Sequence, residues 1–488
     1  MNPMSPLPFS IDRDAKASLS SQIYTGLRNA IHQGTLTQGA RLPSWRDLAV
    51  QLGVSRGTVR VVYERLLDEQ LLISRGASGT WVSEAPIAPP AVPERSISHP
   101  FPDFWPDFAT RPATFQMGVP AQDAFPFKLW TRMMLRNARA AALQPVSYPD
   151  PRGAPALRQE IASYLAIARG LHCTADQVLV TAGFSVALGI AARALKLEGA
   201  RAWFEDPGFP LTRRALEIAG LTVVPVPVDG EGLDVQQGIA IADHAALALV
   251  TPGQQAPLGM TMTLARRKAL LAWAAGQNAY IIEDDYMGEL QLQGRAAPAL
   301  ASIDHTGRVL HVGTFSKTIS PSLRLAFMVV PSGLALTFAE TAACLAPAPN
   351  VAVQQTVTEF IREGHYLRHL RKMKRLYATW QQRLADTLRE LVPSGYDVEA
   401  HGGFAVRLIL PNGYDDVAVA ERALQYGLAP VPLSPWYLAA PANAPRGLLL
   451  GATNYSERTL RKDCLKLLEL VEASGGGRRG PTRSGQTG

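Results

Sequence analysis

The sequence predicts a protein of two folded parts, a small helical module followed by a larger domain of the α/β class. Residues 12–83 carry short helical patterns, residues 84–112 are rich in proline, and residues 113–473 alternate short β-branched runs with longer amphipathic stretches. Such alternation is typical of a mostly parallel sheet flanked by helices. The proline-rich stretch is expected to be an extended linker rather than a packed unit.

The composition is that of a globular protein with a sizeable core. Of the 488 residues, 47% are apolar and 18% are charged. No run approaches the roughly 18 apolar residues that a membrane helix requires, and no secretory signal is expected at the N-terminus. The three cysteines, Cys173, Cys344 and Cys464, lack metal-ligand spacing. We therefore expect a cytoplasmic protein with reduced thiols, no metal site and no membrane partner.

The net charge of +7 permits a polyanionic partner without proving one. The glycine-rich tail, residues 474–488, contributes three of the positive charges and is predicted to be disordered. More informative is the stretch between Arg41 and Arg65, which contains five arginines and only two acidic residues. This local excess of positive charge coincides with the helical module.

Two short helices separated by a glycine-containing turn are predicted in that module. An amphipathic helix from Gln22 to Gln33 comes first. Ser44 is expected to cap the next helix, Gly53 to end it in the left-handed conformation, and Ser55 to cap the helix that follows. This arrangement is a helix-turn-helix. The segment LLISRGASGTWV is then expected to form two short strands, a wing beside the helices.

The second helix of a helix-turn-helix presents its N-terminal residues to the major groove of DNA. Here those residues include Ser55, Arg56, Thr58 and Arg60. Arginine can bond bidentately to guanine, and the hydroxyls can reach bases or phosphates. The alternative is a solvated surface helix with scattered arginines, which for any single arginine is the simpler interpretation. The ordered series as a whole favours a DNA reader.

Residues from about 19 to 83 resemble the GntR-type winged helix across nearly the whole module. The matching pieces are QIYTGLRNAI, RLPSWRDLA, LGVSRGTVR and GASGTWV. The resemblance implies double-stranded DNA as a partner, with contacts at Arg46, Arg56, Thr58 and Arg60, and Gly76 in the wing. Gly57 stands where the family often carries threonine, which puts one contact in question.

A lysine in a hydroxyl-rich turn marks a candidate cofactor site in the larger domain. GTFSKTISPSLRLAF, residues 313–327, follows an apolar run and contains Lys317, with Arg324 seven residues further on. Lys317 would form a Schiff base, while Thr314, Ser316 and Arg324 would supply donors and charge to a phosphate. Surface lysines near serines are common, so this motif does not decide the matter alone.

A cluster of acidic residues ends another predicted strand, in IIEDDYMGEL, residues 281–290. Ligands of open α/β sheets bind at the carboxyl ends of strands. Asp284 is our choice for a carboxylate that keeps a pyridine nitrogen protonated, with Tyr286 bonded to the phenolic oxygen of the ring. Glu283 or Asp285 could instead support the site from behind or cap a helix.

Two further segments would complete such a site. In VTAGFSVALGIAARAL, a strand, a glycine turn and a helix would place the backbone N–H groups of Gly183, Phe184 and Ser185 around a phosphate. In WFEDPGFPL, Phe209 is placed to stack on a pyridine ring. Strand–glycine–helix units are common without a ligand, and a buried phenylalanine in a core loop is as good an interpretation of the second segment.

Residues from about 113 to 472 resemble a fold-type-I aminotransferase of class I/II. The whole chain resembles the MocR subgroup of GntR-family transcription regulators, in which this reader is fused to that fold. The resemblance rests on SYPDPRG, QVLVTAG, EDPGFP, TPGQQ, IIEDDY and GTFSK. It implies pyridoxal 5'-phosphate as cofactor, with Lys317 as the Schiff-base lysine, Asp284 on the ring nitrogen and Tyr286 on the phenolic oxygen.

The same resemblance implies roles for four further residues. Thr314 and Arg324 would bind the phosphate, and Phe209 would stack on the ring. Tyr148 would be lent to the phosphate site of a neighbouring subunit, which requires a homodimer that binds paired DNA half-sites.

The sequence departs from aminotransferases where their substrate carboxylate is held. Leu449 stands where the family has an arginine, and Arg446 is three residues out of register. Phe184 replaces a small polar residue in the phosphate turn. We therefore expect a regulator that responds to the cofactor or to a small amine or amino acid. The alternative is a working pyridoxal-phosphate-dependent aminotransferase, a transferase, with an appended DNA-binding module.

Overall fold

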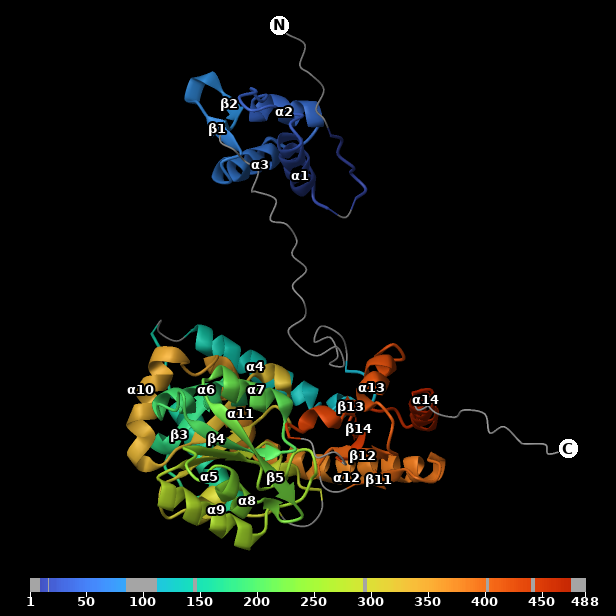
Figure 1. The fold of residues 1–488 in the computed structure, drawn as a ribbon. Coiled ribbons are helices and arrows are strands. Elements are labelled where there is room, and N and C mark those ends of the chain that lie inside the picture. Colours follow the sequence, from blue (N-terminus) through green and yellow to red (C-terminus); the bar gives the residue numbers. More distant parts are fainter. Residues whose placement is uncertain are drawn as a thin grey trace, which may run out of the picture. The chain divides into compact units, whose positions relative to one another are not determined.

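The computed structural model describes residues 9–15, 17–84, 112–143, 147–292, 296–400, 403–439 and 444–474. The chain divides into two compact units, Met1–Ser98 and His99–Gly488 (Figure 1). The linker predicted at residues 84–112 and the tail predicted at residues 474–488 lie almost entirely outside the described residues. Within the described ranges, no helix is both long enough and apolar enough to cross a membrane.

The described residues of the first unit form three helices and a two-stranded antiparallel sheet. These elements are α1 (Leu19–His32), α2 (Trp45–Leu52), α3 (Arg56–Asp68), β1 (Leu72–Ser74), the 3-10 turn η1 (Gly76–Ser78) and β2 (Thr80–Val82). The winged helix-turn-helix that the sequence predicts is therefore confirmed. The first helix begins earlier than predicted because the side chain of Ser18 accepts a hydrogen bond from Ser21 N and caps it there.

The predicted helix boundaries of the reader follow from local hydrogen bonds. Ser44 accepts from Asp47 N at the start of α2, and Ser55 accepts from Thr58 N at the start of α3. Gly53 ends α2 with φ 62°, a conformation that glycine adopts without strain. The unit has its own core, which includes Leu27, Leu48, Val59, Val62, Tyr63, Leu66 and Val82.

An eight-stranded sheet forms the centre of the second unit, in the order β3-β10-β9-β8-β7-β4-β5-β6. Its strands are β3 (Val178–Thr181), β4 (Arg201–Asp206), β5 (Thr222–Asp229), β6 (Gly232–Leu233), β7 (Leu247–Val250), β8 (Tyr280–Asp285), β9 (Val309–Thr314) and β10 (Ala326–Val329). Strands β5, β4, β7, β8 and β9 run parallel, whereas β10 and β6 are antiparallel to their neighbours. The predicted mostly parallel sheet is confirmed.

Helices cover both faces of this sheet (Figure 1). They are α4 (Phe127–Ala142), α5 (Pro155–Arg169), α6 (Phe184–Ala194), α7 (Pro210–Ile218), α8 (Val235–Ile241), α9 (Leu264–Gln277), α10 (Ala335–Leu345) and α11 (Val351–Arg362). Because side chains alternate along a strand, Phe204 joins the core under α6, α7 and α10, whereas Trp203 joins the core under α8 and α9.

A second, antiparallel sheet of four strands follows in the chain, in the order β11-β12-β14-β13. Its strands are β11 (Asp397–Glu399), β12 (Ala405–Leu410), β13 (Val431–Pro432) and β14 (Arg446–Gly451). The helices of this region are α12 (His365–Leu391), α13 (Asp416–Leu424) and α14 (Leu460–Glu472). Val406 and Leu408 of β12 and Leu448 and Leu450 of β14 point into a core shared with the helices. The intervening residues of both strands therefore face the opposite way.

Candidate functional site

The carboxyl ends of five strands meet at one edge of the large sheet. Strands β4, β7, β8 and β9 are parallel. Strand β3 ends level with β9 because Thr181 and Thr314 both pair with Ala326. A cavity of about 390 Å³ opens beside this edge, and the small sheet contributes part of its wall. Its lining includes Gly183, Phe184, Ser185, Phe209, Asp284, Tyr286, Thr314, Ser316, Lys317 and Arg324.

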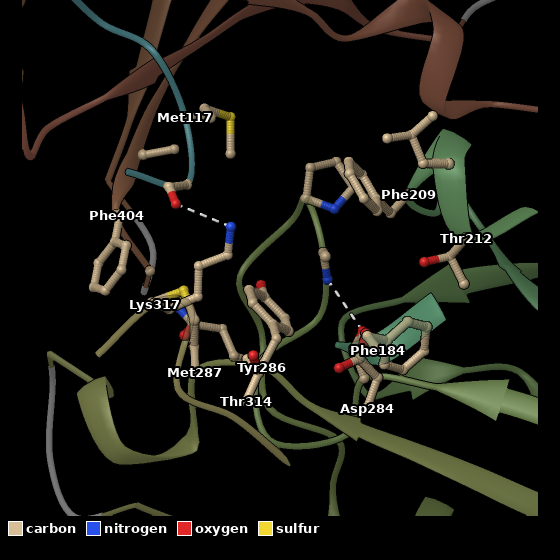
Figure 2. Close-up of a pocket in the computed structure, with 18 of the residues that line it drawn as sticks. Met117, Phe184, Phe209, Thr212, Asp284, Tyr286, Met287, Thr314, Lys317 and Phe404 are labelled. Carbon is tan, nitrogen blue, oxygen red and sulfur yellow. Dashed lines mark hydrogen bonds between the residues drawn. The ribbon is translucent and has the colours of Figure 1, made fainter. Parts of the chain in front are cut away.

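Lys317 points into the cavity from the turn after β9 (Figure 2). Its Nζ donates a hydrogen bond to the carbonyl oxygen of Gly118 at 3.0 Å. Gly118 has φ 74°, and a Cβ there would stand 2.5 Å from Nζ, so the close approach requires glycine. Burial lowers the pKa of Lys317, an effect that the nearby carboxylate of Asp284 partly opposes. The neutral, nucleophilic amine is thereby favoured.

Asp284 faces the same cavity from β8 (Figure 2). No hydrogen bond to its carboxylate is found among the described residues. Burial raises the pKa of Asp284 to about 8, and the charges of Asp285 and Glu205 add to the rise. The cavity therefore contains a carboxyl group that lacks a cationic partner in direct contact.

The two acids beside Asp284 point away from the cavity, as alternation along a strand requires. Glu283 accepts hydrogen bonds from Leu300 N and Ala301 N and lies 2.9 Å from His311 Nδ1. Asp285 forms a bidentate ion pair with Arg169, at 2.7 and 2.9 Å. Of the three acids, only Asp284 lines the cavity. Glu283 and Asp285 instead hold β8 in place through their contacts with other parts of the domain.

Tyr286 and Glu205 bring two more ionisable groups to the cavity wall. Burial, followed by the charge of Asp284, raises the pKa of Tyr286, so its hydroxyl stays protonated. Burial also raises the pKa of Glu205 to about 7, although Thr251 donates to it from both its backbone N and its hydroxyl. Sequence reasoning assigned no role to Glu205.

Helix α6 directs its N-terminus at the cavity. Gly183 caps this helix with φ 123°, and the wall continues through Phe184 and Ser185. A Cβ at Gly183 would lie 2.9 Å from Nη2 of Arg324, so the guanidinium rests against the start of the helix. Thr314 accepts a hydrogen bond from Ser316 N through its hydroxyl. Helix N–H groups, a guanidinium and hydroxyls thus surround one end of the cavity, as in anion sites.

Phe209 lines the cavity at the start of α7, and its ring centroid lies 5.3 Å from that of Trp436. Tyr148, by contrast, is fully exposed and does not line the cavity of its own chain. The structure therefore brings the predicted site residues of this unit together, with the exception of Tyr148.

Gln254 is a wall residue to which sequence reasoning gave no role. Both polar atoms of its side-chain amide are buried and have no hydrogen-bond partner among the described residues. A buried amide without partners costs free energy, so a water molecule or a polar ligand in the cavity would stabilise it. The segment TPGQQ contains this residue, but nothing in its spacing reveals which of its two glutamines lacks partners.

The predicted reader residues lie on the surface of the first unit. Arg46 is exposed on α2, where its guanidinium lies 4.8 Å from the ring centre of Trp45. Arg56 and Arg60 are exposed on α3, and Arg60 pairs with Glu64 at 2.8 Å. For Arg56, no hydrogen bond or ion pair is found within the described ranges. The guanidinium at the start of α3 is thus available to a partner.

The other three predicted contacts are Ser55, Thr58 and Gly76. The hydroxyl of Ser55 lies 2.8 Å from that of Thr58 and already caps α3, so it is engaged within the protein. Gly76 lies in the wing with φ 60°, and no neighbouring atom lies within 4 Å of the position that a Cβ would take there.

Two families match the chain. Residues 19–82 match the bacterial regulatory proteins of the gntR family, and residues 121–438 match aminotransferase class I and II. The probable rhizopine catabolism regulatory protein MocR of Rhizobium meliloti is 35% identical over 470 residues, 93% of each chain. The pyridoxine biosynthesis transcriptional regulator PdxR of Corynebacterium glutamicum is 30% identical over 93% of this chain and 96% of its own. This chain belongs to the MocR subgroup of GntR-family transcription regulators.

Solved structures agree on the fold of the second unit of this MocR-type chain. Kynurenine aminotransferase of Pyrococcus horikoshii has a TM-score of 0.67 and 23% identity, covering 75% of this chain and 92% of its own. The α-aminoadipate aminotransferase LysN of Thermus thermophilus also has a TM-score of 0.67 and 23% identity. The predicted fold-type-I aminotransferase architecture is confirmed.

Proposed function

We propose that this MocR-type chain binds double-stranded DNA through its winged helix and pyridoxal 5'-phosphate in the cavity around Lys317. Occupancy of the cavity then shifts the population that is competent to bind DNA. The limits we propose are 12–83 for the DNA-binding domain, 84–112 for the linker, 113–473 for the cofactor domain and 474–488 for a disordered tail. The observation that carries the proposal is that one cavity is lined by the amine of Lys317 and by the carboxyl group of Asp284, for which the described residues provide no hydrogen bond.

The chemistry of the wall residues fits pyridoxal phosphate. Lys317, whose pKa is lowered by burial, is suited to a Schiff base with an aldehyde. A protonated pyridine nitrogen would give Asp284 the cationic partner that it lacks, and the protonated hydroxyl of Tyr286 can donate to a phenolic oxygen. When bound, the cofactor supplies an electrophilic carbon and an electron-withdrawing ring.

The opposite end of the cavity fits a phosphate. The backbone N–H groups of Gly183, Phe184 and Ser185 lie at the positive end of α6, where an anion is stabilised. Arg324 adds a charge beside Gly183, while Thr314 and Ser316 add hydroxyl donors. The aromatic face of Phe209 is available to a planar ring.

On the DNA side, α3 of the winged helix supplies the reading surface. Arg56, which has no partner in the described structure, would contact a base edge, and Thr58 and Arg60 would follow along the groove. Arg46 would bind the backbone from α2, with Gly76 of the wing close to a neighbouring phosphate. Ser55 contributes by capping α3, which fixes the direction in which Arg56 leaves the helix.

Assembly completes the proposal. We propose a homodimer in which Tyr148 of each chain reaches the phosphate site of the other. This would account for a tyrosine that is fully exposed in its own chain. A twofold dimer presents two winged helices, so its operator would contain paired half-sites.

A second candidate function, amino-group transfer, is favoured by the same Lys317, Asp284 and Tyr286. A half-reaction assay with a panel of amino acids and amines separates the two functions. Rapid conversion of several amino acids would support an enzyme with an appended reader.

The proposed function is tested by recovering genomic DNA fragments on the purified full-length chain, with and without pyridoxal phosphate. We expect a set of fragments with a shared repeated motif, whose recovery changes when the cofactor is added. Recovery of random fragments under both conditions would contradict the proposal, and the cofactor's visible absorption, read from the same sample, reports whether the cavity was filled.

A further inference from the structure

The small sheet places an arginine on the cavity wall. In the register of β12 and β14, Arg407 is the direct partner of Leu449. Directly opposed residues of an antiparallel pair have Cβ atoms about 5 Å apart on the same face of the sheet. Arg407 therefore stands beside the position at which the sequence lost an arginine.

Leu449 itself is not part of the cavity lining. It is fully buried and packs with Leu433 and Trp436. Of these three residues, only Trp436 is among the described residues that line the cavity. Arg446 cannot replace the lost arginine, because its exposed side chain lies at the start of β14, an odd number of residues away and therefore on the other face. Arg407 is the cation that this sheet presents to the cavity.

The guanidinium of Arg407 is only partly engaged. Its Nη2 forms an ion pair with Glu399, its direct partner on β11, and its side chain is 12% exposed. Among the described residues, Glu399 is its only acceptor, so Nε and Nη1 have donors to spare. Of the described lining residues, only Lys317, Arg324 and Arg407 are cationic, and Arg324 is at the α6 end.

We infer that Arg407 binds the carboxylate of an amine-bearing ligand in this cavity, with the amine directed toward Lys317. The inference rests on the proposed function and deepens it by giving the class of effector, an amino acid. A carboxylate accepts two parallel hydrogen bonds from a guanidinium, which provides both affinity and orientation. The apolar surfaces of Met117, Phe209 and Trp436 would enclose the carbon chain between the two charged ends.

The competing explanation is that Arg407 serves only the sheet, through its pair with Glu399. The two explanations predict different effects of one substitution on carboxylate binding. If Arg407 binds a ligand, Glu399→Gln frees its guanidinium and strengthens carboxylate binding. If the pair is merely structural, Glu399→Gln and Arg407→Met should have the same effect, a loss of stability with no change specific to carboxylates.

The experiment is calorimetric titration of the full-length, pyridoxal-phosphate-loaded protein. The probes are L-alanine and the ω-amino acids from glycine to 6-aminohexanoate, each compared with the amine that carries a methyl group in place of its carboxylate. At least one amino acid should bind more tightly than its matched amine. Arg407→Met should weaken the binding of that amino acid about 10- to 100-fold, whereas the binding of its matched amine should be unchanged. Arg407→Lys should give an intermediate loss.

Arg266→Met is the matched control, because Arg266 is a similarly buried arginine paired with Asp229 away from the cavity. The inference is overturned if no amino acid binds the wild type more tightly than its matched amine, or if Arg407→Met binds amino acids with the same affinity as the wild type. Failure of the wild type to take up pyridoxal phosphate or to bind DNA would instead count against the proposed function. Thermal unfolding of each variant shows that it is folded.

Discussion

Burial moves the pKa values of Lys317 and Asp284 in opposite directions, each toward the neutral form of the group. An amine and a carboxyl group that are both shifted toward their neutral forms gain less from one another than an ion pair would. Both gain from a ligand that offers a carbonyl carbon to the amine and a basic nitrogen to the carboxyl group. At the scale of single residues, the cavity is thus chemically complementary to pyridoxal phosphate.

Lys317→Ala should abolish the visible absorption that a Schiff base gives to the purified, pyridoxal-phosphate-treated protein, and borohydride should bleach it in the wild type. The physical reason is that Lys317 is the only lysine among the described residues of the cavity wall. Lys372→Ala serves as the control, because this lysine is exposed on α12 and donates to Ala124 O. Absorption that persists in Lys317→Ala would mean that another lysine holds the cofactor.

Asp284→Asn should flatten the pH dependence of stability in the cofactor-free protein. The pKa of Asp284 rises from about 4 in the unfolded chain to about 8 in the folded one, so the native state binds more protons between these values. Wild-type stability should therefore fall as pH rises from about 5 to about 8. Thermal unfolding across this range measures the slope. Asp386→Asn, an exposed control on α12, should leave it unchanged, and an unaltered slope in Asp284→Asn would refute the assignment.

At the scale of elements, the sequence was most informative where structure is local. The caps Ser44 and Ser55 and the stop at Gly53 depend on residues within one turn of each other, so the reader could be placed from the sequence alone. The strand that carries Asp284 could likewise be recognised, and alternation of side chains along it then decides which of three acids faces the cavity.

The unpredicted parts of the site depend on pairing between distant segments. Arg407 lies beside Leu449 because of the register between β12 and β14, which no local pattern specifies. Similarly, the partner of Lys317 is a carbonyl 199 residues earlier in the chain. The unpaired amide of Gln254 could not be found from sequence, because a lack of partners is a property of the packed structure.

For α3, the testable claim is that Arg56 contacts a base edge. Arg56→Ala should weaken specific DNA binding by about 1–3 kcal/mol. Arg28→Ala, an exposed arginine on α1, removes the same charge from the same module and should have a smaller effect. Anisotropy titrations at several salt concentrations distinguish the roles, because an arginine on a phosphate would weaken all sequences and reduce the salt slope. Equal binding by Arg56→Ala and wild type would exclude Arg56 from the interface.

At the scale of the whole molecule, each unit has a separate hydrophobic core. Reader substitutions should therefore leave the cofactor's absorption intact. Communication between the units requires that the ligand bind one conformation of the assembled protein more tightly than another. A ligand with equal affinity for both conformations would not change their relative populations. The proposed dimer provides such an assembly, because each cavity would depend on both chains.

Tyr148 tests that dimer. Tyr148→Phe should weaken cofactor binding, and mixing it with the Lys317→Ala chain should restore one intact cavity in each heterodimer. The restoration arises because the Lys317→Ala chain still lends its Tyr148 to the partner's site. Cofactor titration of the mixture measures it, and sedimentation measures assembly. A monomer at micromolar concentration, or no restoration on mixing, would show that Tyr148 does not act across a subunit boundary.

The coupling of cofactor to DNA is tested most directly by the affinity of the full-length chain for its own recovered operator, titrated at fixed salt with and without pyridoxal phosphate. The expected result is that the dissociation constant changes when the cofactor is added to the wild type, and that Lys317→Ala gives one value under both conditions. Equal wild-type affinity in the two states, with the cofactor's absorption present, would contradict it.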